Sequence, residues 1–413
     1  MASYSFEVLK NRDFRILCAT RLFGTMALQA QAVIVGWQIY SLTHSTFKLG
    51  LVGLAEAVPA ISCSLIAGHI VDISRPYRIF LACIAALVCN MCFLYLVASG
   101  MIALPDDVRV VCIFAGVFFS GIARSFLSPS SFALQPRIVP RQQIPSASAW
   151  LTSAFQTGII AGPAIAGIIY GGYGPPVAWL MPVSLMCVEL VILFGISQEH
   201  REFRGQEKRE PSFVSIREGA RFLITNHLLL CVMALDMFAV LFGGAVSMLP
   251  AVADQVLHVG SQGLGLLRAA PAMGAVAVTL WFAVKPLKVM RGALLLAAVA
   301  GFGVSIIVFG FSQWFWVSML CLAASGAFDS VSMLIRHTLV QWLTPEGMRG
   351  RVSAVSTMFI ISSNEIGAFE SGLAAHFLGL TPSIVLGGIG TLIVVAVTAV
   401  IYPKLRATVV SAD

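Results

Sequence analysis

Apolar residues form long runs along the chain, separated by short polar segments. Most runs reach about 20 residues, the length of an α-helix that crosses a lipid bilayer. A transmembrane barrel would instead show short segments of alternating polarity, so the runs predict helices. The predicted spans are 14–41, 49–70, 78–98, 108–132, 146–171, 177–196, 226–251, 262–284, 292–311, 314–338, 351–378 and 383–402.

One long polar segment, 197–225, divides these spans six and six. It is rich in charged residues between Glu199 and Glu210, which a bilayer interior would not accept. We therefore predict an N-terminal six-helix bundle (1–196), a cytoplasmic central loop (197–225) and a C-terminal six-helix bundle with a short cytoplasmic tail (226–413).

The composition agrees with a membrane protein and excludes several other classes. Hydrophobic residues make up 58% of the chain and charged residues 11%, against roughly 25% charged in soluble domains. The net charge of +7 comes from scattered basic residues with no soluble domain to carry them, so nucleic acid is not an expected partner. No phosphate-binding loop, metal motif or catalytic constellation is found, so we expect no enzyme activity, cofactor or metal.

Basic residues are distributed unevenly between the two ends of the predicted spans. Most of the 26 lysines and arginines fall on the side of the N-terminus and the even-numbered connections, whereas the opposite side has Lys48 and Arg109. Because cytoplasmic loops are enriched in Lys and Arg, both termini are predicted to be cytoplasmic. Four arginines lie inside spans: Arg21, Arg124, Arg268 and Arg336.

The two halves show weak similarity to each other, and four local motifs accompany it. Ser120-Gly121 aligns with Ser325-Gly326, for example, and Gly162 and Gly167 align with Gly367 and Gly372. The motifs are Thr43-His44-Ser45-Thr46, Leu249-Pro250-Ala251-Val252-Ala253-Asp254, the stretch Thr344 to Arg351, and Asn364-Glu365-Ile366-Gly367. With these features the chain resembles the major facilitator superfamily, and within it bacterial drug and siderophore exporters of the enterobactin and macrolide efflux type.

This resemblance covers essentially the whole chain and implies a fold and a location. The implied fold is all-α, with twelve transmembrane helices in two parallel six-helix repeats. The implied location is the bacterial inner membrane.

Two sequence motifs of the superfamily have counterparts here. In the loop after the second span, Gly68, Asp72 and Arg78 match the family pattern, but Ile73 and Pro76 replace its basic residues. In the fifth span, Gly158, Gly162, Pro163 and Gly167 resemble a motif of exporters. Glycines four apart permit close helix contact, and the proline removes a helical hydrogen bond.

Charges within the spans form a pattern between the halves. Arg124 aligns with Asp329 and Arg21 with Asp236, and the resemblance implies that the first, fourth, seventh and tenth spans line a central cavity. We expect either that these residues pair across the halves as a proton-sensitive gate, or that acids pair within a half, for example with Arg336. Glu56 and Glu365 are further candidates for coupling, whereas Glu189 is expected to be structural.

Polar side chains also repeat at helical spacing in the first and fourth spans. Arg21, Thr25 and Gln29 share one face, and Ser120, Arg124 and Ser128 another. A polar stripe on an apolar helix indicates contact with water, so Thr25, Gln29, Ser120 and Ser128 are predicted to line a substrate cavity.

The function predicted from these features is secondary active transport. We expect a monomeric, proton-coupled exporter that expels a small amphipathic molecule, drug or siderophore by alternating access. Two alternatives stay open: a proton-coupled importer on the same fold, and a lipid-handling membrane protein.

Overall fold

The structure is a computed structural model that describes residues 7–201, 212–285, 289–345, 348–407 and 409–411. The chain divides into two compact units. The first contains Met1–Leu42 and Ala55–Ser212, and the second contains Thr43–Leu54 and Phe213–Asp413. Each unit is described by itself.

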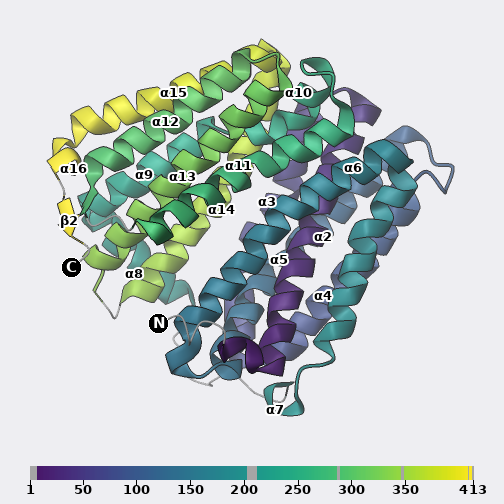
Figure 1. The fold of residues 1–413 in the computed structure, drawn as a ribbon, viewed down its shortest axis with the longest axis horizontal. Coiled ribbons are helices and arrows are strands. Elements are labelled where there is room, and N and C mark those ends of the chain that lie inside the picture. The colour runs from purple at the N-terminus through teal and green to yellow at the C-terminus, as the bar shows by residue number, and fades with distance from the viewer. Residues whose placement is uncertain (1–6, 202–211, 286–288, 346–347, 408, 412–413) are drawn as a thin grey trace. The chain divides into compact units, whose positions relative to one another are not determined.

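Long helices build the first unit, drawn in purple to teal in Figure 1. They are α2 (Arg12–Thr43), α3 (Thr46–Ile73), α4 (Pro76–Ala98), α5 (Asp106–Ile138) and α6 (Ile144–Leu193), with the short η1 (Val8–Lys10), η2 (Arg141–Gln143) and α7 (Gln198–Arg201). Helix α6 is broken at Gly174, whose φ of 79° and ψ of −179° are not helical. It therefore consists of two helices, close to the predicted boundary between 171 and 177.

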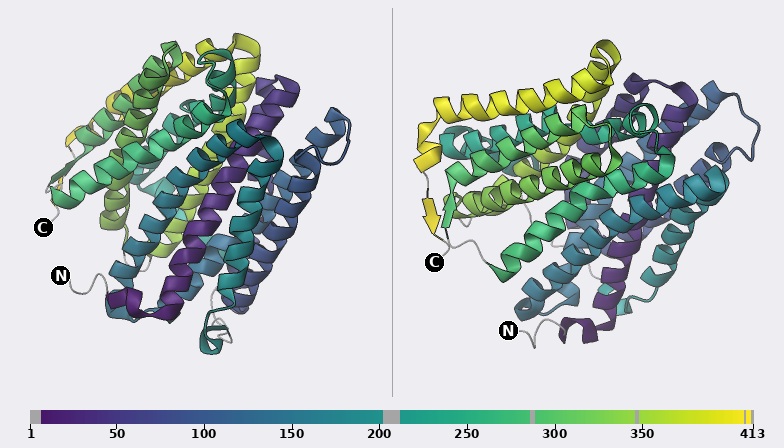
Figure 2. Two further views of the ribbon diagram at one scale, coloured as in Figure 1. Left: turned by 45° about the vertical axis from the view of Figure 1, so that its right-hand side comes forward. Right: turned by 45° about the horizontal axis from the view of Figure 1, so that its top comes forward.

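The second unit is also helical, apart from one small sheet (Figure 2). Its helices are α8 (Ser212–Thr225), α9 (His227–Phe242), η3 (Ala245–Met248), α10 (Leu249–Gln255), α11 (Gly260–Val284), α12 (Gly292–Phe311), α13 (Phe315–Leu343), α14 (Arg349–Leu378), α15 (Leu380–Ile401) and α16 (Pro403–Ala407). Strands β1 (Val289–Arg291) and β2 (Val409–Ser411) pair antiparallel, with Met290 opposite Val410.

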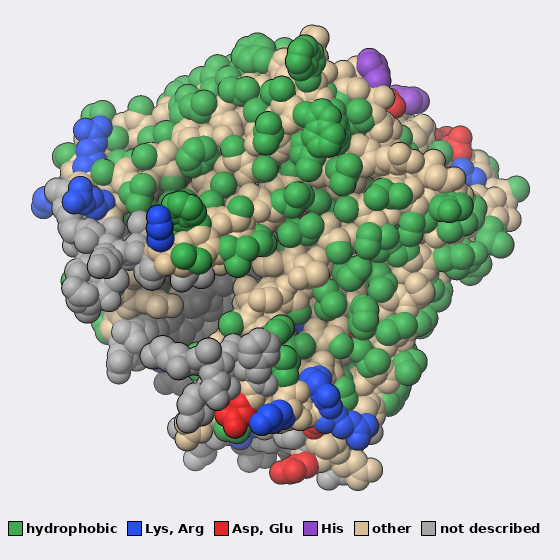
Figure 3. Space-filling view, viewed as in Figure 1, with side chains coloured by type: hydrophobic (Ala, Val, Ile, Leu, Met, Phe, Trp, Pro, Cys, Tyr) green, Lys and Arg blue, Asp and Glu red, His purple; other side chains and the backbone are tan. Residues whose placement is uncertain are grey.

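The helices confirm the predicted all-α membrane fold. By length and composition, 10 helices among the described residues qualify as membrane spans. Helix α6 counts as two because of its break, and the 30-residue α14 covers the eleventh predicted span, so the arrangement is consistent with twelve. Hydrophobic side chains are spread across the face in Figure 3, with charged side chains mainly toward its margins, as expected for a protein surrounded by lipid.

Part of the predicted central loop is helical. Helix α8 occupies 212–225, and its Leu223 lies in a buried cluster with Val352 and Val355 of α14. A side chain at Gly219 would meet the backbone of Arg351 at 2.7 Å, so the two helices approach closely. The sequence did not indicate this amphipathic helix, because mean hydropathy along the segment averages the polar face of the helix with its apolar face. The remainder of the loop, 202–211, lies outside the described residues.

Two further details differ from the predicted elements. The predicted span 226–251 is discontinuous, since α9 ends at Phe242 and η3 and α10 follow it. Gly244 permits this break to pack against α14, because a side chain there would lie 2.7 Å from the carbonyl oxygen of Gly367. The first turns of α3 also group with the second unit, where Gly50 packs directly on Gly372.

Candidate transport site

An arginine and a glutamate from neighbouring helices form an ion pair in the first unit. Arg124 of α5 binds Glu56 of α3. The two helices approach closely at Gly121, where a methyl group would lie 2.5 Å from the carbonyl oxygen of Glu56 and 2.8 Å from Pro59. The side chain of Arg124 is 44% exposed and that of Glu56 21%. The pair is therefore only partly buried.

Arg21 has its own surroundings within the first unit. Its guanidinium lies 4.5 Å from the centre of the Phe155 ring on α6, a cation–π contact. It also interacts electrostatically with Glu189 in the second part of α6. Glu189 is buried, with 2% of its surface exposed, and fits against Gly24, one turn from Arg21. Glu189 thus lies at the contact between α6 and α2, and its structural role stays a prediction.

In the second unit, Asp236 of α9 forms an ion pair with Arg336 of α13. Both side chains are almost completely buried, with exposed fractions of 10% and 5%. Both residues belong to the same half of the chain. The structure therefore has Asp236 paired within its half and not across the halves, which is one of the two alternatives expected from the sequence. Such a pair joins α9 to α13 and compensates each buried charge.

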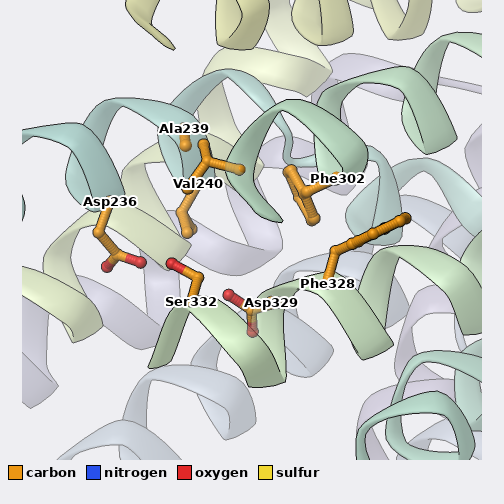
Figure 4. Close-up of a pocket in the computed structure, with 8 residues that line it drawn as sticks. Asp236, Ala239, Val240, Phe302, Phe328, Asp329 and Ser332 are labelled. Atoms are coloured by element: carbon orange, nitrogen blue, oxygen red, sulfur yellow. The ribbon is translucent and has the colours of Figure 1, made fainter. Parts of the chain in front are cut away.

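A small cavity adjoins this pair. Its polar lining consists of Asp236, Asp329 and Ser332, and its apolar lining includes Phe302 and Phe328. Figure 4 shows the two carboxylates and the Ser332 hydroxyl around one small space. Asp329, Ser332 and Arg336 recur every three to four residues, which places them on one face of α13. Ser332 is not among the residues predicted from the sequence, although its spacing from Asp329 and Arg336 could have indicated it.

The residues predicted to line a substrate cavity do not form one set. Ser128 is exposed and Gln29 is half-buried. Thr25 and Ser120 are buried, and the Thr25 hydroxyl donates to the carbonyl oxygen of Arg21 at 2.7 Å. The assignment of these four residues to a substrate cavity stays a prediction.

The glycines of the fifth span pack against the first span, as small residues in membrane helices do. A methyl group at Gly158 would lie 2.7 Å from Thr25 Cβ, and one at Gly162 would lie 2.7 Å from the carbonyl oxygen of Met26. Pro163 and Gly167 are also buried. This tight contact explains the burial of Thr25.

The remaining candidates are placed as follows. Glu365 lies on α14 close to Gly53, where its Oε2 would be 3.4 Å from an added methyl group. Gly68 lies near the end of α3 with no atom near an added methyl group, and Arg78 is exposed on α4. The side chain of Asp72 lies outside the described side chains. The role of this loop in conformational change stays a prediction.

Known proteins share this arrangement of helices. The sequence model of the transmembrane secretion effector family, within the major facilitator superfamily, matches residues 3–412. The chain belongs to this family. It is therefore a membrane transporter and not an enzyme.

Relatives extend over nearly the whole chain. An enterobactin exporter, EntS, of Citrobacter koseri is 24% identical over 393 residues, which cover 95% of this chain and 92% of the relative. EntS of Escherichia coli O1:K1 is 25% identical with the same coverage. The suspected resemblance to the exporter branch of the superfamily is confirmed by these matches.

Solved structures of transporters share the fold. A bacterial homologue of the iron transporter ferroportin, in an inward-facing state, has a TM-score of 0.72 at 14% identity, covering 96% of this chain and 99% of its own. A peptide transporter bound to sulfate has a TM-score of 0.72 at 11% identity, covering 96% and 95%. At such identities the likeness shows the fold alone.

Proposed function

We propose that the transporter exports a siderophore-like small molecule across the bacterial inner membrane and that protons drive this export. The observation that carries the proposal is the end-to-end match to enterobactin exporters together with the secretion family that spans 3–412. The close glycine contact between α6 and α2 supports it, because that stretch resembles the exporter motif. We further propose a monomer with both termini in the cytoplasm, since basic residues gather on that side.

For the conformational change we propose that Arg124 exchanges partners. Its side chain is accessible and binds Glu56 in this structure, and Asp329 occupies the aligned position in the second half. Pairing with Asp329 would close one gate, and protonation of Asp329 would release it. Asp236 is buried in its pair with Arg336, whereas the Arg124 side chain is exposed, so we base the gate on Arg124 and Asp329.

Transport into inverted membrane vesicles tests the function. Vesicles that contain the transporter should accumulate an iron-free catecholate siderophore when an inward-acidic pH gradient is imposed, and nigericin should abolish the accumulation. Vesicles that lack the transporter serve as the inactive control. Siderophore movement that is equal with and without the gradient would contradict proton coupling, and no movement of any siderophore would contradict the substrate class.

A further inference from the structure

The cavity beside the Asp236–Arg336 pair has the composition of a cation site. Its polar lining atoms are the oxygens of Asp236, Asp329 and Ser332, and carboxylate and hydroxyl oxygens bind hard cations rather than soft metals. The cavity has room for about one water molecule. A ligand of that size is a protonated water or a small dehydrated ion.

The Ser332 hydroxyl provides an independent indication of a ligand. Ser332 is 2% exposed, and its Oγ has no hydrogen-bond partner among the described residues. A buried hydroxyl without a hydrogen-bond partner is energetically unfavourable. It lines the cavity with the two carboxylates (Figure 4), so a bound cation or hydrated proton there would satisfy it.

The charges around the cavity indicate a ligand with one positive charge. The charge of Arg336 compensates that of Asp236. The negative charge of Asp329 therefore remains as the net charge of the cavity lining. Asp329 is exposed and has no ion pair or hydrogen bond within the part of the chain that the structure describes. Phe302 and Phe328 form an apolar wall, which weakens screening and strengthens attraction for a cation.

The other helices packed against α9 and α13 contribute few charges near this site. Helices α12 and α15 carry no charged residue in their sequences. The remaining titratable or charged groups on α9, α11, α13 and α14 are His227, Cys231, Arg268, Cys321, Arg336, His337, Arg349, Arg351, Glu365, Glu370 and His376. None of these eleven lines the cavity.

We propose that Asp329, Ser332 and Asp236 form the binding site for a single monovalent cation, either a proton carried on water or Na⁺, in the second unit. Asp329 lies at the exposed side of the site and supplies the main negative charge for the cation. Ser332 supplies a neutral oxygen, and Arg336 holds Asp236 in place. The role of this site as the coupling site rests on the proposed ion-driven export. Binding itself requires no transported substrate.

Cation binding to the purified full-length transporter in nanodiscs tests the site. For sodium, the melting temperature is measured as NaCl replaces choline chloride at constant pH and ionic strength, since a ligand of the folded state raises it. For protons, uptake is followed with an indicator dye in sodium-free buffer. A saturable response to Na⁺ identifies sodium, and a single titration step that Na⁺ does not alter identifies the proton.

Two variants connect the response to the cavity. Asp329→Asn should abolish the response, and Ser332→Ala should move the midpoint about ten-fold, the effect of losing one hydrogen bond to a charged group. Ser325→Ala is the matched control, because Ser325 is buried on the same helix and its hydroxyl bonds the Leu322 carbonyl at 2.7 Å. Its response should equal that of the unaltered protein.

The outcomes separate this site from the proposed function. A protein that responds to neither cation overturns the site, as do Asp329→Asn and Ser332→Ala variants that both behave like Ser325→Ala. Cation binding without siderophore movement in vesicles contradicts the export proposal alone. Proton-driven export by a protein with no such binding contradicts the site alone.

Discussion

Each of the two units joins neighbouring helices with an arginine–carboxylate pair, but the pairs differ in exposure. Arg124 and Glu56 in the first unit are 44% and 21% exposed, whereas Arg336 and Asp236 in the second are 5% and 10% exposed. Water screens an accessible pair, which costs little to separate. A buried pair cannot lose one partner without leaving an uncompensated charge. The first pair is thus suited to exchange partners, and the second to hold a fixed arrangement of charge.

The largest effect is expected from breaking the buried pair. Arg336→Gln leaves Asp236 buried without its cation, which should destabilise the protein by about 3–5 kcal/mol. Thermal unfolding of the purified protein in nanodiscs measures the change. Arg217→Gln on α8 is a suitable control, because Arg217 is exposed.

A double-mutant cycle sharpens this prediction. Asp236→Asn combined with Arg336→Gln removes both charges, so the double variant should be less destabilised than the two single losses added together. If Arg336→Gln lowered the free energy of unfolding by less than about 1 kcal/mol, this pair would contribute no more than an ordinary surface ion pair. The contrast between the units would then disappear.

The sequence predicted the spans well and included a pair of Arg336 with an acid of the same half among its alternatives, but it could not predict the Arg124–Glu56 pair. Long apolar runs specify membrane helices because lipid requires internal hydrogen bonds, and the predicted boundaries match most helices closely. Pairing of Arg124 with Glu56 depends on how closely α5 approaches α3 at Gly121, and no periodicity within one helix contains that information. The cavity likewise depends on three helices, α9, α12 and α13.

The amphipathic α8 shows a different limit of sequence analysis. Its three charged residues, Arg217, Glu218 and Arg221, follow a strongly charged stretch, so the segment as a whole resembles a solvated loop. Leu223 is nevertheless buried, and Ala220 and Phe222 pack against the same cluster. Burial of those side chains on α14 determines the helix, and this contact lies more than a hundred residues away in the sequence.

An intermediate loss of stability is expected at Gly121, where α5 approaches α3 beside the Arg124–Glu56 pair. Gly121→Ala places a methyl group 2.5 Å from the Glu56 carbonyl oxygen, which is backbone and cannot rotate away. Overpacking of this kind costs about 1–3 kcal/mol. Gly172→Ala is the control, since no atom lies within 4 Å of a methyl group there, and it should be neutral or slightly stabilising. Equal unfolding temperatures for the two variants would show that α3 and α5 can separate easily.

The smallest effect on stability, with a large effect on transport, is expected at the accessible pair. Arg124→Gln should change the free energy of unfolding by no more than about 1 kcal/mol, because water can solvate the remaining Glu56. If Arg124 exchanges partners during transport, the same variant should lose siderophore accumulation in inverted vesicles at normal protein levels. Glu56→Gln removes the other partner and should retain more transport than Arg124→Gln, since the arginine could still reach Asp329. A variant that unfolds readily, or one that transports normally, would show instead that this pair merely fastens α5 to α3, as its buried counterpart fastens α9 to α13.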